Sequence, residues 1–298
     1  MITAPGVYEM ADTDYHADPC ASASLSASIA KVLLARSPRH AWIKHPRLNP
    51  DYKPDFDGKY DIGTAAHAAV LQGLDVCDAL PFDDWRTKAA REARDCARAE
   101  NRIPLLSKDY ATVQDMRTAA VTAIAECADL SGVTLADGDA EKTLAWQEGG
   151  IWCRARLDWL SHKRDLIIDY KTTSASANPS AWARTMAGMG GEIQPAFYLR
   201  GNAATGGPTR THWVFLVQET YAPYACSFVG LSPAYLAWAA EKVTEAIRLW
   251  TACMSANDWP GYQSRITYLD PPSWGQIEWN VRMSEQQPTE NGEPFPWE

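Results

Sequence analysis

The sequence predicts an α/β (α+β) fold, with a central mixed sheet flanked by helices and a largely helical N-terminal half. Three observations predict this class. Up to about residue 135, apolar residues recur at helical spacing. From about residue 136, they gather in short β-branched or aromatic runs that turn residues separate. A long amphipathic segment closes the series, so the expected order is helices, three strands, helices, two strands and a helix.

The N-terminal half contains three segments with helix signals. They are residues 22–37, residues 63–73 and residues 107–130, the last of which opens on Ser107 as a candidate N-cap. Because each has apolar residues at helical spacing, we expect these helices to cover the sheet.

The C-terminal half contains the expected strands and the long helix. The strands cover residues 141–148, 150–160, 165–173, 210–219 and 224–231. The letters "SHKR" between the second and third strands predict a hairpin. Residues 232–258 predict a helix, because Ser232 is a good N-cap, Pro233 suits the first turn and apolar residues follow one face.

Composition restricts the class of protein. The chain has 298 residues, 46% of them hydrophobic, which is enough for a buried core. No apolar run approaches the ~18 residues of a membrane span, and the first residues lack the layout of a secretory signal, so we expect a cytoplasmic protein without a membrane partner. The seven cysteines are scattered without a C-x-x-C pair, which argues against a disulfide framework and against a zinc or iron–sulfur site.

The charge distribution allows two interpretations. A net charge of −9 disfavours a nucleic-acid partner at first, because phosphate binding needs positive potential. One segment is nevertheless basic, with Arg86, Lys88, Arg91, Arg94 and Arg98. In a helix the last three arginines share a face. The segment is therefore either a DNA contact or a solvated surface with salt bridges.

Two acids and a lysine form the central candidate site. Asp169 and Lys171 end the third strand two residues apart, so their side chains leave the same face. The hairpin would bring Asp158 beside them. Adjacent carboxylates of this kind suit Mg²⁺ or Mn²⁺. The same letters "DYK" at residues 51–53 lie in a polar, proline-flanked segment that predicts a loop, and an Asp–Lys surface pair is the alternative for residues 169–171.

Three polar residues on predicted helices complete the constellation. His67 lies among small residues four positions after Gly63, and a histidine in this setting, taken by itself, is more often a core residue than a ligand. Gln194 and Tyr198 are four positions apart on one face of a helix that contains Pro195 near its start. Each of these residues alone would be ordinary.

Taken in order, G-x-x-x-H, D, D-x-K and Q-x-x-x-Y resemble the RecB-like branch of the PD-(D/E)XK nuclease superfamily. Blocks such as "GTAAHAAVLQG", "CRARLDWL", "IIDYKTT" and "QPAFYLRG" further resemble the RecE-like exonucleases of the exodeoxyribonuclease VIII type. The resemblance runs from about residue 14 to about residue 274. Two departures are Leu157, where the superfamily often has proline, and Pro195 directly after Gln194.

The resemblance implies a restriction-endonuclease-like core and a metal-dependent 5′ to 3′ exonuclease on linear double-stranded DNA. Such an enzyme produces 3′ single-stranded overhangs for recombination, acts with a RecT-like single-strand annealing protein and forms a ring. It implies one nuclease domain over residues 1–283, with a helical part to about 135, a catalytic core over about 136–260 and a flexible tail over 284–298.

The resemblance also assigns roles to matching residues. His67, Asp158 and Asp169 would bind the metal, with two Mg²⁺ or Mn²⁺ ions per site, and Lys171 would act at the attacking water. Gln194 and Tyr198 would support the site, and Glu141 occupies a strand position where relatives also have an acid. Three alternatives remain: an endonuclease of the same fold, a Cas4-like component, which the missing cysteine cluster disfavours, and a DNA-end-binding protein with a vestigial site.

Overall fold

The computed structural model describes residues 1–53, 62–73, 76–100 and 102–285. The chain forms two units, Met1–Gly261 and Tyr262–Glu298. Of the tail predicted over residues 284–298, residues 286–298 lie outside the described residues. In the described part of the chain, no helix is both long enough and apolar enough to cross a membrane.

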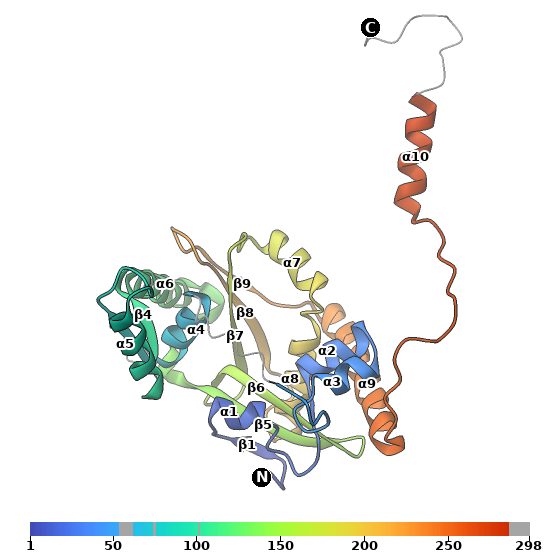
Figure 1. The fold of residues 1–298 in the computed structure, drawn as a ribbon, viewed down its shortest axis with the longest axis horizontal. Helices are drawn as coiled ribbons and strands as arrows, with labels where there is room; N and C mark the ends of the chain where they lie inside the picture. Colours follow the sequence, from blue (N-terminus) through green and yellow to red (C-terminus); the bar gives the residue numbers. More distant parts are fainter. Residues whose placement is uncertain (54–61, 74–75, 101, 286–298) are drawn as a thin grey trace, which may run out of the picture. The chain divides into compact units, whose positions relative to one another are not determined.

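The first unit is built on a mixed sheet of seven strands in the order β1-β5-β6-β7-β8-β9, with β2 paired to β6 (Figure 1). β3 and β4 form a separate parallel pair. The strands are β1 (Gly6–Tyr8), β2 (Leu25–Ser26), β3 (Cys77–Leu80), β4 (Ile103–Leu106), β5 (Gly138–Glu148), β6 (Ile151–Ser161), β7 (Leu166–Thr173), β8 (His212–Glu219) and β9 (Cys226–Val229). The predicted fold class and the five predicted strands are confirmed.

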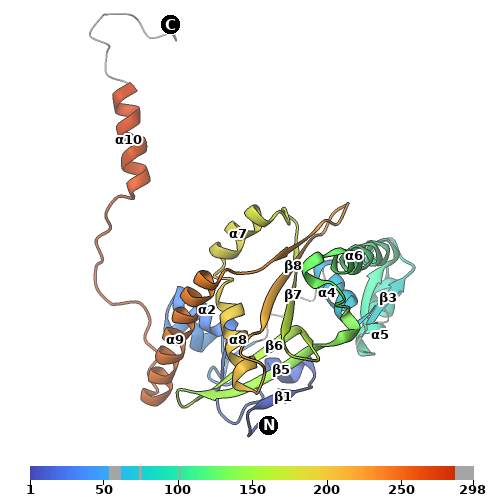
Figure 2. The same ribbon diagram turned by 180° about the vertical axis from the view of Figure 1, so that it is seen from behind.

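Helices cover both faces of this sheet. The helices of the first unit are α1 (Asp12–His16), α2 (Ala27–Ala35), α3 (Pro38–Ile43), α4 (Ile62–Gln72), α5 (Lys88–Ala99), α6 (Ser107–Glu126), α7 (Pro179–Gly188), α8 (Ile193–Ala204) and α9 (Pro233–Ala256), while α10 (Ser273–Glu285) belongs to the second unit. One core joins α2, α7, α8 and α9 to one face, and a second joins α4 and α6 to the other, as the two opposite views show (Figures 1 and 2). Neighbours on β7 alternate between these cores, since Ile167 belongs to the first and Ile168 to the second.

The two predicted helix caps have different outcomes. Ser232 accepts a hydrogen bond from the Tyr235 backbone N–H, and Pro233 begins α9, so this prediction is confirmed. The prediction for Ser107 is wrong. Ser107 is the first helical residue, and its hydroxyl donates to the Leu80 carbonyl instead of capping the helix. The hydroxyl therefore ties α6 to β3.

The N-terminal half is less purely helical than predicted, because β1 to β4 lie within it. These strands have between two and four residues each. A strand this short has no readable alternation of apolar and polar residues, so the sequence does not reveal it.

The pairing of β6 with its two neighbouring strands is irregular near Asp158. β6 and β7 pair only at Trp159↔Ile168 and Leu160↔Ile167 and then part. β5 and β6 keep one register along their length, but the ladder omits the position at which Glu141 faces Asp158. Glu141 has a left-handed backbone with φ of 59°. The two strands on either side of β6 therefore both break their regular pairing beside Asp158.

The second unit has an unusually apolar surface. Its described part contains α10 and nine exposed large apolar side chains. These are Tyr262, Ile266, Tyr268, Leu269, Trp274, Ile277, Trp279, Val281 and Met283.

Candidate active site

The fork between β6 and β7 positions the first acid. Where the strands part, the Tyr170 backbone N–H has no β6 carbonyl beside it, and it donates to Asp158 Oδ2 at 2.9 Å. The Asp158 side chain thus replaces the missing strand partner. The predicted hairpin, which turns between Ser161 and Arg164, is confirmed.

Asp169 and Lys171 point to the same side of β7, as the spacing predicts. Lys171 Nζ forms an ion pair with Asp169 Oδ2 and lies 3.8 Å from Asp158 Oδ2. The Asp169 side chain is buried, whereas a third of the Lys171 side chain is exposed (33%). The ammonium group therefore lies between two carboxylates, on a side chain that is partly open to solvent.

α4 brings His67 into the same cluster. Three fully buried alanines, Ala65, Ala66 and Ala69, let this helix approach closely, and the His67 ring packs on the Tyr170 ring with centroids 5.8 Å apart. His67 Nε2 lies 3.0 Å from Asp158 Oδ2. His67 is therefore not an isolated core histidine, which was the alternative interpretation.

Glu141 faces the other side of this imidazole. Its Oε1 lies 3.8 Å from His67 Nδ1, and its Oε2 is held by Arg156 Nε. The left-handed backbone at Glu141 directs its carboxylate toward His67. A residue with regular strand geometry at this position would instead pair with Asp158 in the β5–β6 ladder. Sequence position alone gave Glu141 no defined role, and the structure places it beside the histidine.

α8 supplies the last predicted pair. Gln194 Nε2 donates to Asp169 Oδ1 at 2.6 Å. Pro195 lies in the first turn, where its missing N–H breaks no helical hydrogen bond, so the helix begins as required. Tyr198 is buried and packs edge-to-face on Trp213 with ring centroids 5.5 Å apart. Burial raises the pKa of Tyr198 well above its ordinary value.

The pKa values of the two aspartates are shifted in opposite directions: that of Asp169 is raised and that of Asp158 is lowered. Burial, and then the charge of Asp158, raise the pKa of Asp169 to about 7, although Lys171 and His67 act against this. Burial alone would also raise the pKa of Asp158, but Lys171, His67 and the Tyr170 N–H outweigh it and lower that pKa. Asp158 is therefore ionised, whereas the positive charge near Asp169 is too small to offset its burial and the charge of Asp158.

The neighbouring acids raise the pKa of both basic groups of the site. Burial would lower the pKa of His67, but Asp158 and Glu141 raise it. Burial would likewise lower the pKa of Lys171, but Asp169 and Asp158 raise it.

The donor atoms suit a divalent cation. In the described ranges, no three His, Cys, Asp or Glu side chains are already arranged around a common ion position. Carboxylate oxygens and an imidazole are nevertheless ligands that Mg²⁺ or Mn²⁺ accepts. The raised pKa of Asp169 shows that further positive charge at this point would be stabilising. Asp158, Asp169 and His67 therefore fit the ion.

The basic helix α5 packs on the β3–β4 pair (Figure 1). Three of the five candidate DNA contacts, which lie on α5 or, for Arg86, just before it, are paired with nearby acids: Arg86 with Asp84, Lys88 with Glu92, and Arg94 with Asp95. These pairs fit the interpretation as a solvated surface. A role in DNA binding remains a prediction.

Sequence reasoning missed two basic residues near the site. Arg156 precedes Asp158 by two positions on β6, a spacing that could have identified it. Lys31 belongs to the apolar helix α2, and its pKa is lowered by burial and then by the charge of Lys171. A single lysine within "SIAKVLLA" is the signal that was available.

The fold and this constellation define a class, the PD-(D/E)XK-type α/β domain. Residues 32–272 match the family described as "PDDEXK-like domain of unknown function (DUF3799)". The chain belongs to this family. Family and fold together support a nuclease, and PD-(D/E)XK nucleases generally use divalent metal ions. No curated protein matches the sequence.

One solved structure shares the fold. A candidate exonuclease from Eubacterium rectale has a TM-score of 0.53 at 10% identity, over 91% of this chain and 98% of its own. A phage-related exonuclease from Haemophilus somnus 129PT has a TM-score of 0.29 at 12% identity, over 65% of this chain and 95% of its own. At this identity the first similarity shows the fold alone, and the second is too low to support an argument.

Proposed function

We propose that this protein is a metal-dependent exonuclease that degrades one strand of linear double-stranded DNA in the 5′ to 3′ direction. The observation that carries the proposal is the cluster at the β6–β7 fork, where Asp158, Asp169 and Lys171 meet between His67 and Gln194. The exonuclease activity and the direction of digestion come from the resemblance to RecE-like enzymes.

The proposed reaction is hydrolysis of a phosphodiester. The oxygen of a water molecule bonds to phosphorus, the bond to the 3′-oxygen breaks, and that oxygen takes up a proton. Asp158, Asp169 and His67 would hold two Mg²⁺ or Mn²⁺ ions, which when bound supply Lewis acidity and neutralise charge.

The other residues act through position and charge. The Lys171 ammonium would orient the attacking water and stabilise negative charge at phosphorus, a role that its exposed side and raised pKa permit. Gln194 holds Asp169 Oδ1 at 2.6 Å, so the second oxygen of this carboxylate faces Lys171. Tyr198 keeps α8 in place through its contact with Trp213.

Linear and covalently closed circular duplexes of one sequence, incubated with Mg²⁺, test the proposal. Loss of linear DNA alone supports an exonuclease. Cutting of circles would instead indicate an endonuclease, and binding of ends without cutting would indicate a DNA-end-binding protein. Separate 5′ and 3′ end labels report the direction, because a 5′ to 3′ enzyme releases the 5′ label first.

We also propose that the protein self-associates into a ring and acts with a RecT-like annealing protein. The nine exposed apolar side chains of the second unit support self-association, since exposed apolar patches often mark protein interfaces. Light scattering should give a mass above the 32.9 kDa of one chain, and Trp274→Ser with Ile277→Ser should lower it. A monomeric wild type at working concentration would contradict the ring.

A further inference from the structure

Glu141 holds a strained backbone conformation at the edge of the candidate site. A residue other than glycine at φ of 59° is strained and persists only where its surroundings hold it. The Glu141 carboxylate lies between two basic groups, with His67 Nδ1 at 3.8 Å from Oε1 and Arg156 Nε on Oε2. The strained backbone therefore keeps the Glu141 carboxylate between His67 and Arg156.

Arg156 is itself firmly held. Only 14% of its side chain is exposed, and its guanidinium lies 5.8 Å from the centre of the Tyr15 ring. Its Nη1 is 3.5 Å from the Met10 carbonyl and 3.9 Å from Asp12 Oδ1. The N-terminal segment therefore fixes the arginine that binds Glu141.

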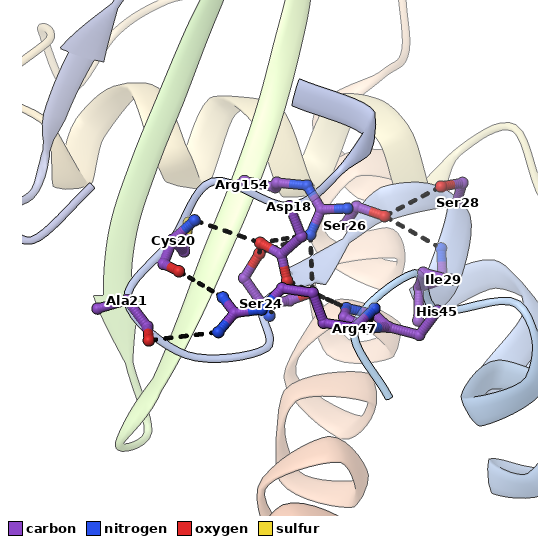
Figure 3. Close-up of polar contacts among 10 residues, drawn as sticks. All are labelled: Asp18, Cys20, Ala21, Ser24, Ser26, Ser28, Ile29, His45, Arg47 and Arg154. Carbon is purple, nitrogen blue, oxygen red and sulfur yellow. Dashed lines mark hydrogen bonds and ion pairs between the residues drawn. The ribbon is translucent and has the colours of Figure 1, made fainter. Parts of the chain in front are cut away.

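A buried cluster anchors this N-terminal segment in turn. Arg154, two residues earlier on β6, lies 5.4 Å from the same Tyr15 ring and pairs with Asp18 at 3.1 Å (Figure 3). Because Tyr15 packs on both arginines, the position of Arg156 depends on a part of the fold that lies outside the candidate site.

The two nitrogens of His67 face different acids. Nε2 faces Asp158 at 3.0 Å, and Nδ1 faces Glu141. A histidine that binds a metal through one ring nitrogen usually donates its other N–H to a carboxylate or carbonyl, which fixes the tautomer and the ring orientation. Glu141 is on the side of the ring where such an acceptor is needed.

We propose that Glu141 is a positioning residue and not a metal ligand. Once the metal is bound, Glu141 Oε1, now 3.8 Å from Nδ1, would move closer, accept the Nδ1–H of His67 and keep Nε2 directed toward Asp158, while Arg156 holds the Glu141 carboxylate in place. The inference deepens the proposed nuclease function and rests on it. Direct metal binding by Glu141 is disfavoured because Arg156 occupies Oε2 and the imidazole lies between Oε1 and Asp158.

Mn²⁺ binding by the full chain tests the role. We expect Glu141→Gln to weaken Mn²⁺ binding about 10- to 100-fold, the usual effect of removing an acceptor behind a metal ligand. Glu141→Gly should do the same and should fold, since glycine adopts this backbone without strain. Arg156→Met should have a smaller effect of the same sign. Lys142→Gln, next along β5 and paired with Glu9 at 3.2 Å, is the matched control and should bind like wild type.

Two spectroscopic readouts separate the possible roles. Nitrogen-15 NMR with diamagnetic Mg²⁺ should show the Nδ1–H tautomer of His67 in wild type, and a mixture of tautomers in the Glu141 variants at the same Mg²⁺ concentration, because they bind the ion more weakly. Pulsed EPR should count the same number of waters on Mn²⁺ in wild type and in Glu141→Gln. One additional water in that variant would make Glu141 a ligand and overturn the inference.

Unchanged affinity and tautomer in both Glu141 variants would also overturn it, while leaving the proposed function in place. If the wild type binds no Mn²⁺, the proposed function fails and this inference fails with it. The two failures are therefore distinguishable.

Discussion

The fork site, formed by His67, Glu141, Asp158, Asp169 and Lys171, and the buried cluster around Asp18 contain the same kinds of side chain. Both include a residue of the same strand, β6. Each has a buried aspartate, a histidine and a basic residue, and in each one acid has a positive φ: Glu141 at 59° in the fork site, and the buried Asp18 itself at 63° in the other cluster. They differ in how completely the aspartate is satisfied.

Asp18 has donors on both of its oxygens. The Ser24 N–H donates at 2.8 Å and the Ser24 hydroxyl at 2.6 Å, while Cys20 N–H, Arg154 and His45 lie at 3.4, 3.1 and 3.3 Å (Figure 3). Burial would raise the pKa of Asp18, but these partners outweigh it and lower that pKa. The Asp18 carboxylate is therefore satisfied without any ligand.

Asp169 is the contrasting case. Its partners are Gln194 and Lys171, Lys171 is shared with Asp158, and its pKa is raised to about 7. A buried acid with a full set of hydrogen-bond donors stabilises the fold. A buried acid that has too little positive charge around it is instead suited to bind a cation.

Asp169→Asn should abolish Mg²⁺-dependent digestion of linear duplex while the protein stays folded, because it removes a ligand charge without opening a cavity. Digestion and thermal melting measured on the same preparation check this. Asp51→Asn is the matched control, since Asp51 heads the other "DYK" in an exposed turn, and it should digest normally. Full activity of the Asp169 variant would remove this residue from the mechanism.

Asp18→Asn should have the reverse effect. It leaves the Arg154 charge buried without its counter-ion, which costs about 3–5 kcal/mol of unfolding free energy. Denaturant unfolding should show this loss, while the molecules that remain folded at low temperature should still cut DNA. A variant as stable as wild type would show that the Asp18 cluster does not have the structural role assigned to it.

Lys171→Ala should slow single-turnover cutting by roughly 10²- to 10³-fold, as expected when one electrostatic interaction in the transition state is removed. Binding to duplex ends in Ca²⁺ should be retained. Lys53→Ala, from the exposed copy of the tripeptide, provides the control and should cut at the wild-type rate. An unchanged rate in Lys171→Ala would reduce Lys171 to a structural partner of the acids.

Replacing Arg91, Arg94 and Arg98 with glutamine should weaken end binding for all DNA sequences alike. Each arginine–phosphate interaction that is removed should flatten the slope of log K against log salt by about 0.9. Fluorescence anisotropy in Ca²⁺ across a salt series measures this. The exposed residues Lys163, Arg210 and Arg248, changed together to glutamine, control for net charge. Equal slopes in the two triple variants would make α5 a solvated surface.

The catalytic half of the fold could be predicted because its information is local. Strand runs, the hairpin and the two-residue spacing of Asp169 and Lys171 follow from periodicity. The tripeptide alone was insufficient, since Asp51 lies in an exposed turn and Asp169 in a buried strand. The flanking aliphatic residues made the difference.

The remaining features depend on contacts between distant segments. Asp18, Ser24, His45 and Arg154 come from separate parts of the chain, and no spacing connects them. The left-handed backbone of Glu141 has no signal in the sequence, because glycine would be the expected residue there. The short strands β1 to β4 give too few residues for a pattern.

The most direct test of the central claim is the unfolding free energy of metal-free protein against pH, for wild type and Asp169→Asn. A carboxyl whose pKa rises from 3.8 to about 7 on folding makes the native state bind the extra proton, so its contribution to stability falls as pH rises across that interval. Wild type should therefore lose stability relative to Asp169→Asn as the pH rises from about 4 to about 7, and Mg²⁺ should restore it. Parallel pH profiles that Mg²⁺ leaves unchanged would contradict the account.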